Sequence, residues 1–378
     1  MMRGRVDDEN RISVVIPTYN REKRIGNCLD SILNQTHKVY EIIVIDDCSM
    51  DATADVVRQY QEKYVDDNII YDRLKKNYGA QVARNRGIEL ARGKWICFCD
   101  SDDEWLKNKI EVQFDVLKNN GFNEYIVIHG NCEVNDTVKN KRYVWQLPIV
   151  QGTDCYGALL RYPGPMFQAI LTSRSALIEV GKLGEDIKSY QEWDTSLRLA
   201  KICDFIHIEN PLFIYNLHSG DQISDDVVKD CDGYEYIIDK YKDDILSICG
   251  EETWNRHIMR LITKAIEKRR DFIECYVNKL KIRNLVVGKK YILFGCGQFG
   301  SCIEEVLRIV GGEVVAYVDN NKKKFNDNIV YSLNEIRKKD NEVFFITTPK
   351  YQNDIAKQLD DAGYKKGIDY IKYTDVFS

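Results

Sequence analysis

Short apolar runs alternate with amphipathic stretches along the first third of the chain. Within the amphipathic stretches, apolar residues recur at intervals of three and four, which is typical of a helix with one buried face. The predicted strands cover residues 12–17, 41–47, 69–74 and 94–100, and the predicted helices cover residues 25–33, 51–64, 79–91 and 110–121. Asn20 is available as N-cap of the first helix. This alternation predicts a parallel sheet with helices on both faces.

The rest of the chain changes character twice. Residues 125–225 mix strand-like and helical signals, whereas the following stretch shows only helical spacing, with Trp254, Ile258 and Leu261 on one apolar stripe. A strand, a glycine-rich turn and a helix begin near Val286. We therefore expect an α/β domain over residues 1–225, a helical linker segment over residues 226–285 and a small Rossmann-like α/β domain over residues 286–378.

Composition narrows the class of protein. The 378 residues carry a net charge of −5, which argues against general nucleic-acid binding because that needs a basic surface. The cysteines form no C-x-x-C pair, so neither a zinc site nor a redox motif is indicated. The N-terminus lacks the apolar core of a secretory signal, and no apolar run is long enough to span a membrane. We expect a cytoplasmic protein whose membrane contact, if any, is peripheral at the inner face of the cell membrane.

Carboxylates gather where two predicted strands end. Asp46 and Asp47 close one strand, and Asp100, Asp102 and Asp103 follow another. Ligands of parallel sheets bind at the carboxyl ends of strands, so these side chains are expected on one rim. Alternate residues of an extended segment point the same way, so Asp100 and Asp102 can share a task. Mg²⁺ and Mn²⁺ prefer oxygen ligands, and a bound cation would relieve the repulsion between these acids.

The D-x-D segment is compatible with more than a metal site. It could be a solvated acidic start of a helix, because Asp and Glu favour first turns. An EF-hand is excluded because Trp105 stands where that loop requires glycine. A carboxylate pair of a hydrolase stays open on this motif alone.

Three separate segments carry a family resemblance. They are VVIPTYNRE, IIVIDDCSMDAT and NYGAQVARNRGIELARGKWICFCDSDD. In order and spacing they resemble the family 2 glycosyltransferases, over roughly residues 12–220. The resemblance implies a GT-A type mixed sheet flanked by helices, followed here by the helical segment and the small Rossmann-like α/β domain.

The resemblance also implies roles on the donor side of the reaction. Asp47 would accept a hydrogen bond from the base, Asp100 would lie near the ribose and the metal, and Asp102 would ligate Mn²⁺ or Mg²⁺ directly. Asp103 would support the loop, and Arg84 would lie near the diphosphate. The expected nucleotide pocket is lined by Pro17, Thr18 and Tyr19.

The transferase reaction also needs a base for the acceptor hydroxyl. Members of the family usually carry a Glu-Asp pair at a helix start, and the matching segment here is SYQEWDTSLRLA. Glu192 fills the Asp position and Gln191 the Glu position, so Glu192 is the candidate base and Asp194 the reserve. His218, in YNLHSGDQIS, is implied as a metal or phosphate ligand.

The resemblance implies an inverting glycosyltransferase of surface polysaccharide biosynthesis, such as capsule formation. It would move a sugar from a nucleotide-sugar, expected to be a UDP-sugar, to a hydroxyl of a glycan or lipid-linked oligosaccharide acceptor. Peripheral membrane contact and a homo-oligomer are compatible with this interpretation. One alternative is a sugar-phosphate nucleotidyltransferase, although PTYNREKR replaces the glycine-rich loop of that class. The other is a non-catalytic nucleotide- or sugar-binding scaffold.

A second motif lies near the C-terminus. Gly295, Gly297 and Gly300 form G-x-G-x-x-G between a strand and a helix, and Asp319 follows at the end of the next strand. This is the spacing of a dinucleotide-binding turn. It indicates either a second ligand site or a structural, regulatory or docking unit. An NAD-dependent enzyme is disfavoured because no group for hydride transfer is apparent.

Overall fold

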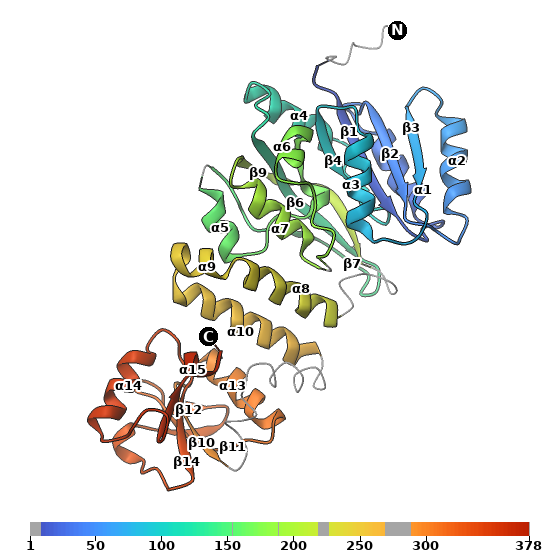
Figure 1. Ribbon diagram of the computed structural model, residues 1–378. Helices are drawn as coiled ribbons and strands as arrows, with labels where there is room; N and C mark the ends of the chain where they lie inside the picture. Colours follow the sequence, from blue (N-terminus) through green and yellow to red (C-terminus); the bar gives the residue numbers. More distant parts are fainter. Residues whose placement is uncertain (1–8, 153, 188, 218–226, 269–288, 378) are drawn as a thin grey trace. The chain divides into compact units, whose positions relative to one another are not determined.

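The computed structural model describes residues 9–152, 154–187, 189–217, 227–268 and 289–377 (Figure 1). The chain forms two compact units, which divide between Ile223 and Ser224. Each unit has its own sheet.

The first unit is built on a mixed sheet with strand order β3-β2-β1-β4-β8-β6-β9-β5, and β7 pairs with β6. Strands β1 to β4 are parallel, whereas β8 runs antiparallel to both of its neighbours. The expected GT-A type mixed sheet is therefore confirmed. The strands are β1 (Ile12–Thr18), β2 (Glu41–Asp46), β3 (Ile69–Arg73), β4 (Trp95–Phe98), β5 (Glu104–Trp105), β6 (Ile126–Asp136), β7 (Lys141–Trp145), β8 (Leu171–Ser173) and β9 (Asp204–Leu217).

Helices flank this sheet (Figure 1). They are α1 (Ile25–Leu33), α2 (Thr53–Lys63), α3 (Ala80–Leu90), α4 (Lys109–Asn119), α5 (Cys155–Arg161), α6 (Arg174–Glu179) and α7 (Gln191–Leu199), with a 3₁₀ turn η1 (Phe167–Ala169). Helix α3 packs on β1 and β2. Its close approach depends on Gly87, because a Cβ there would lie 2.3 Å from Val15 Cγ1.

The predicted N-cap of the first helix is wrong. Helix α1 begins at Ile25, and Arg24 occupies its N-cap position. Asn20 instead has a left-handed backbone with φ of 52°, and its Oδ1 accepts a hydrogen bond from Met50 N at 2.8 Å. An Asn side chain bonds backbone groups in turns as readily as at helix starts, so the type of residue alone could not locate the helix start.

The second unit joins a helical layer to a smaller sheet. The helices are α8 (Val227–Lys240), α9 (Lys242–Asp244), the π-turn η3 (Ile245–Cys249) and α10 (Glu251–Lys268). Trp254, Ile258 and Leu261 of α10 are buried, as the predicted apolar stripe requires. Among the residues that the structure describes, no helix is long and apolar enough to cross a membrane.

The sheet of the second unit has the order β12-β13-β11-β10-β14-β15, and only the β12–β13 pair is antiparallel. A parallel strand–helix–strand unit is thus present, while a Rossmann-like domain that binds a ligand stays a prediction. The elements are β10 (Lys290–Phe294), α13 (Gln298–Ile309), β11 (Glu313–Val318), β12 (Lys324–Phe325), β13 (Asn328–Tyr331), η4 (Leu333–Glu335), β14 (Glu342–Ile346), α14 (Gln352–Asp361), β15 (Tyr370–Lys372) and α15 (Tyr373–Phe377).

We predict that Gly87→Ala lowers the free energy of unfolding by about 1–3 kcal/mol, because the added methyl overpacks the α3–β1 contact. This loss should exceed the gain in helix propensity of about 1 kcal/mol. Gly26→Ala in α1 is the matched control, since its Cβ would come no closer than 3.2 Å to another side chain, at the Tyr60 hydroxyl. Urea unfolding of both variants measures the difference, and equal stabilities would contradict the packing argument.

Candidate active site

The acidic loop after β4 is held together by one amide. Gln168, in η1, donates from Nε2 to Asp100 Oδ2 at 2.6 Å and to Asp103 Oδ2 at 2.7 Å. An amide nitrogen has two hydrogens, so it can serve both carboxylates at once. The structure therefore brings Asp100 and Asp103 together, as the sequence predicted for this rim.

Asp103 faces the interior of the loop. It is 2% exposed, and its Oδ1 accepts a hydrogen bond from the backbone N–H of Asn216 at 2.8 Å. Burial raises the pKa of Asp103 well above its ordinary value, and the charges of Asp102 and Asp100 raise it further. These contacts suit the expected role of Asp103 in supporting the loop.

Arginines neutralise the other two carboxylates. Arg84 of α3 is buried, and its Nη2 lies 2.5 Å from Asp100 Oδ1. The guanidinium also lies over the ring of Phe167, 4.8 Å from its centroid. Arg21 Nη2 lies 3.3 Å from Asp102 Oδ2. Arg21 was not predicted from the sequence, although it follows β1 just as the acidic loop follows the neighbouring β4.

Asp102 is the expected ligand of a hard divalent cation, and its carboxylate supplies the type of oxygen that such an ion prefers. Asp102 has a partly exposed carboxylate, whereas both oxygens of Asp100 already bond Arg84 and Gln168. Among the described residues, no group of three His, Cys, Asp or Glu side chains is placed to hold a metal. Mg²⁺ often needs only one or two carboxylates together with substrate phosphates, so this is compatible with Asp102 as ligand. His218 lies outside the described residues.

The expected nucleotide pocket lies at the end of β1. Thr18 is buried, and its backbone oxygen accepts a hydrogen bond from Asp47 N at 2.8 Å. Asp47 is buried too, and its two oxygens accept the backbone N–H groups of Tyr78 and Gly79, each at 2.7 Å. Asp47 thus anchors the start of α3. A hydrogen bond from a base to Asp47 stays a prediction. Its carboxylate oxygens can each accept a second hydrogen bond for this purpose.

The side chains next to these buried groups differ in exposure. Pro17 is buried at the end of β1. Tyr19 is 41% exposed and Tyr78 is 47% exposed. Exposed aromatic rings beside buried polar groups suit stacking on a planar ligand.

Glu192 and Asp194 both lie in the first turn of α7 but have different surroundings. Glu192 is partly buried, and burial raises its pKa; the charge of Asp100 also raises it, while a backbone hydrogen bond and the charge of Arg84 oppose the shift. Asp194 is fully buried, and its Oδ2 contacts Arg198 Nε at 2.9 Å and Nη2 at 2.8 Å. This geometry favours Glu192 over Asp194 as the base.

Asp194 belongs to an internal clamp. Arg198 Nη1 also donates to the backbone oxygens of Val180 and Lys182, both at 2.5 Å. The ion pair therefore fixes α7 to the segment that follows α6. The i, i+4 spacing of Asp194 and Arg198 was visible in the sequence, but its burial was not.

The C-terminal glycine motif closes mainly on its own chain. A Cβ at Gly300 would lie 2.4 Å from the backbone oxygen of Gly295, so the tight turn requires glycine there. Asp319 Oδ2 accepts a hydrogen bond from Cys296 N at 2.8 Å. Lys322 Nζ donates to Cys296 O at 2.5 Å. Gly297 has open space around its Cβ position, and a second ligand site here stays a prediction.

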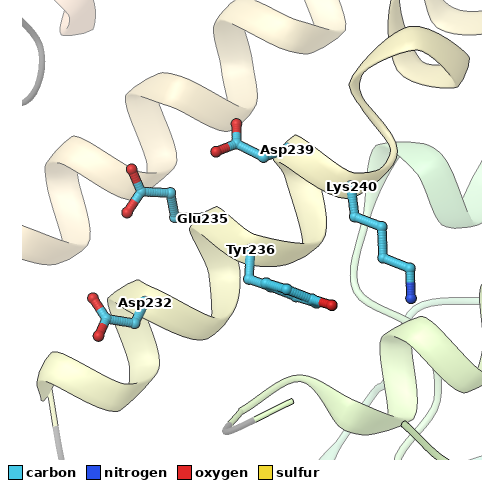
Figure 2. Close-up of a pocket in the computed structure, with 5 residues that line it drawn as sticks. All are labelled: Asp232, Glu235, Tyr236, Asp239 and Lys240. Carbon is cyan, nitrogen blue, oxygen red and sulfur yellow. The ribbon is translucent and has the colours of Figure 1, made fainter. Parts of the chain in front are cut away.

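Two cavities are lined by residues other than these groups. Figure 2 shows one of about 410 Å³ on α8, lined by Asp232, Glu235, Tyr236, Asp239 and Lys240. The three carboxylates lie along one side of the helix, which is the arrangement of a solvated helix face. Another, of about 620 Å³, is lined by Arg11, Gly93 and Lys94 among others. These residues precede β1 and β4, so that cavity is at the amino ends of these strands, opposite the acidic loop.

Two family models match separate parts of the chain. The family model "Glycosyl transferase family 2" matches residues 13–179, and the model "C2185-like, N-terminal" matches residues 287–367. The amylovoran biosynthesis glycosyltransferase AmsB of Erwinia amylovora is 29% identical over 72% of this chain and 97% of its own length. Glycosyltransferase GlyA of Streptococcus pneumoniae is 32% identical over 57% of this chain and 31% of its own length.

TuaG of Bacillus subtilis, whose name assigns it to teichuronic acid biosynthesis, is 42% identical over 28% of this chain and 41% of its own length. The chain thus spans less than half of TuaG and of GlyA. Among solved structures, Staphylococcus aureus TarS 1–349 in complex with UDP-GlcNAc is 18% identical, with a TM-score of 0.48, and the match covers 79% of this chain and 89% of that one. Residues 13–179 of this chain thus match glycosyl transferase family 2.

Proposed function

We propose that the protein is an inverting, metal-dependent glycosyltransferase that moves a sugar from a nucleotide-sugar, expected to be a UDP-sugar, to a hydroxyl of a glycan acceptor. Surface polysaccharide biosynthesis is the proposed setting, in keeping with the name of AmsB, which matches nearly along its full length. The observation that carries the proposal is the acidic loop after β4, where Arg84 pairs with Asp100 and Arg21 with Asp102, because carboxylates for a metal and cations for a diphosphate lie together there. The charges of Asp100 and Arg84 also act on the pKa of Glu192, the candidate base.

The chemistry divides between Glu192 and the charged loop. Glu192 would take the proton from the acceptor hydroxyl as its oxygen bonds the anomeric carbon. The bond from that carbon to the diphosphate oxygen then breaks on the opposite face, so configuration inverts. Arg21 and Arg84 contact the acidic loop from neighbouring segments. As cations held in place, they can stabilise charge on the leaving diphosphate. A divalent ion at Asp102, with His218 as a further proposed ligand, would supply additional positive charge there.

We expect Glu192→Gln to lower kcat by about 10²–10⁴-fold, because the amide cannot accept the proton. Donor affinity, measured by calorimetry, should stay unchanged. Glu179→Gln on α6 is the matched control and should keep full activity, since its carboxylate accepts a hydrogen bond from the exposed Tyr125 hydroxyl. A Glu192→Gln enzyme that transfers sugar at the normal rate would remove Glu192 from the mechanism.

The raised pKa of Glu192 predicts the pH dependence of the wild-type enzyme. The base must be ionised, so kcat/KM should fall as pH decreases through a pKa above the ordinary value of 4.5. The same shift favours the neutral carboxyl in the folded protein, so ionisation at higher pH costs stability. Glu192→Gln should therefore be at least as stable as wild type at pH 7, as measured by thermal unfolding. If kcat/KM falls only through a pKa at or below 4.5, the raised pKa of Glu192 as the base is contradicted.

Asp102 and Asp194 should respond differently to the same substitution. Asp102→Asn should keep the fold and lose stimulation by Mn²⁺ in a titration of donor turnover. Asp194→Asn should lose about 3 kcal/mol of stability, because it removes the buried carboxylate that the partly exposed Arg198 guanidinium contacts. Urea unfolding separates the two effects. Unaltered Mn²⁺ stimulation in Asp102→Asn would remove Asp102 as the metal ligand. A wild-type enzyme that turns over donor without any Mn²⁺ stimulation would instead be metal-independent.

A further inference from the structure

Buried polar atoms without hydrogen-bond partners gather where β1 ends and α3 begins. Within the described part of the chain, partners are lacking for Thr18 Oγ1, for both Nε2 and Oε1 of Gln81, and for Arg84 Nε. The three residues are 3%, 3% and 6% exposed. Buried polar groups are normally hydrogen-bonded, so such a group calls for a specific explanation.

Hydrogen bonds tie the segments that carry these atoms together. Asp47 N donates to Thr18 O at 2.8 Å, and Asp47 Oδ2 accepts from Gly79 N at 2.7 Å, two residues before Gln81. The packing of α3 on β1 also places Gln81 and Thr18 at the same height along β1. Gly87 lies against Val15, and α3 runs back along β1, so Gln81 is about 9 Å further toward the end of β1. Thr18 is about 10 Å beyond Val15 in that direction.

Gln35 shows that this domain satisfies a buried glutamine elsewhere. It is 3% exposed, as Gln81 is. Its Nε2 donates to Ser31 O at 3.0 Å and to Leu106 O at 2.8 Å, and its Oε1 accepts from Ile110 N at 3.1 Å. Because the same side chain is fully bonded at one site and unbonded at the other, the amide of Gln81 is better explained by a ligand than by packing.

The polarity of these atoms selects the kind of ligand. Gln81 Oε1 requires a donor, whereas Gln81 Nε2 and Arg84 Nε require acceptors. A diphosphate offers only acceptors at neutral pH. A nucleoside offers both, through its base and its ribose hydroxyls, and the exposed rings of Tyr19 and Tyr78 at this edge can stack on a base.

We propose that Gln81, together with Thr18, binds the nucleoside part of the donor and sets the affinity for it. This assignment rests on the proposed glycosyltransferase function. It adds a recognition residue to the donor side, in the first turn of α3.

The test compares two Gln→Met substitutions of matched size and burial. Calorimetry first identifies which of UMP, GMP, CMP and AMP the full chain binds. Gln81→Met should bind that nucleotide at least tenfold more weakly, bind inorganic pyrophosphate as wild type does, and unfold at a higher temperature, because an unbonded buried amide is replaced by an apolar group. Gln35→Met should bind the nucleotide normally and unfold at a lower temperature.

Each remaining outcome has one meaning. If wild type binds none of the nucleotides, the proposed function itself fails. If wild type binds one and Gln81→Met binds it equally well, the inference is overturned, and the amide is satisfied by water or by nothing. A lower unfolding temperature of Gln81→Met would show that the free protein already bonds this amide and would also overturn the inference. An equal loss of pyrophosphate affinity would move Gln81 to the phosphate end of the donor and overturn it as well.

Discussion

The carboxylates of Asp100 and Asp103 share the single amide nitrogen of Gln168, and the geometry of the rim follows from this contact. Two carboxylates that accept from the same nitrogen lie close enough to repel each other, and burying Asp103 adds a desolvation cost. Donors from distant parts of the chain offset both terms: Arg84 from α3, Gln168 from η1 and the backbone of Asn216 from β9. Because these elements meet only in the completed mixed sheet, the acidic loop can take this shape only after the sheet has formed.

Two acids of α7 show how surroundings divide roles between similar side chains. Glu192 and Asp194 are two residues apart, and positions at that spacing do not share a helix face. Asp194 faces inward and is held by the guanidinium of Arg198, so its charge is neutralised in place. Glu192 is partly buried, and the charges of Arg84 and Asp100 act on its pKa. A carboxylate with a raised pKa is closer in basicity to what proton abstraction needs, whereas a carboxylate fixed in a buried ion pair is poorly suited to it.

The strands and helices around the rim could be predicted because each is encoded locally. The apolar runs of β1, β2 and β4 are short and end in turn residues, and the aspartates after β4 follow directly. The partners of these aspartates could not be predicted in the same way. Gln168 contacts Asp100 across 68 positions of sequence and Asn216 contacts Asp103 across 113, and no local pattern marks either residue. Arg21 is intermediate: once β1 and β4 are known to be neighbours, a cation after one strand is a natural partner for Asp102 after the other.

Thr18 and Asp47 were grouped in one nucleotide pocket by resemblance, and their hydrogen bonds separate their roles. Asp47 has backbone donors on both oxygens, so its carboxylate holds the start of α3 whether or not a nucleotide is present. The Thr18 hydroxyl and the Gln81 amide, by contrast, have no partner within the described chain. Groups that maintain the fold are already bonded in the free protein, whereas groups reserved for a ligand are left unbonded at a cost in stability. By this criterion Asp47 and Asp103 maintain the fold, and the proposed recognition of the donor rests on the side chains that the fold itself leaves unsatisfied.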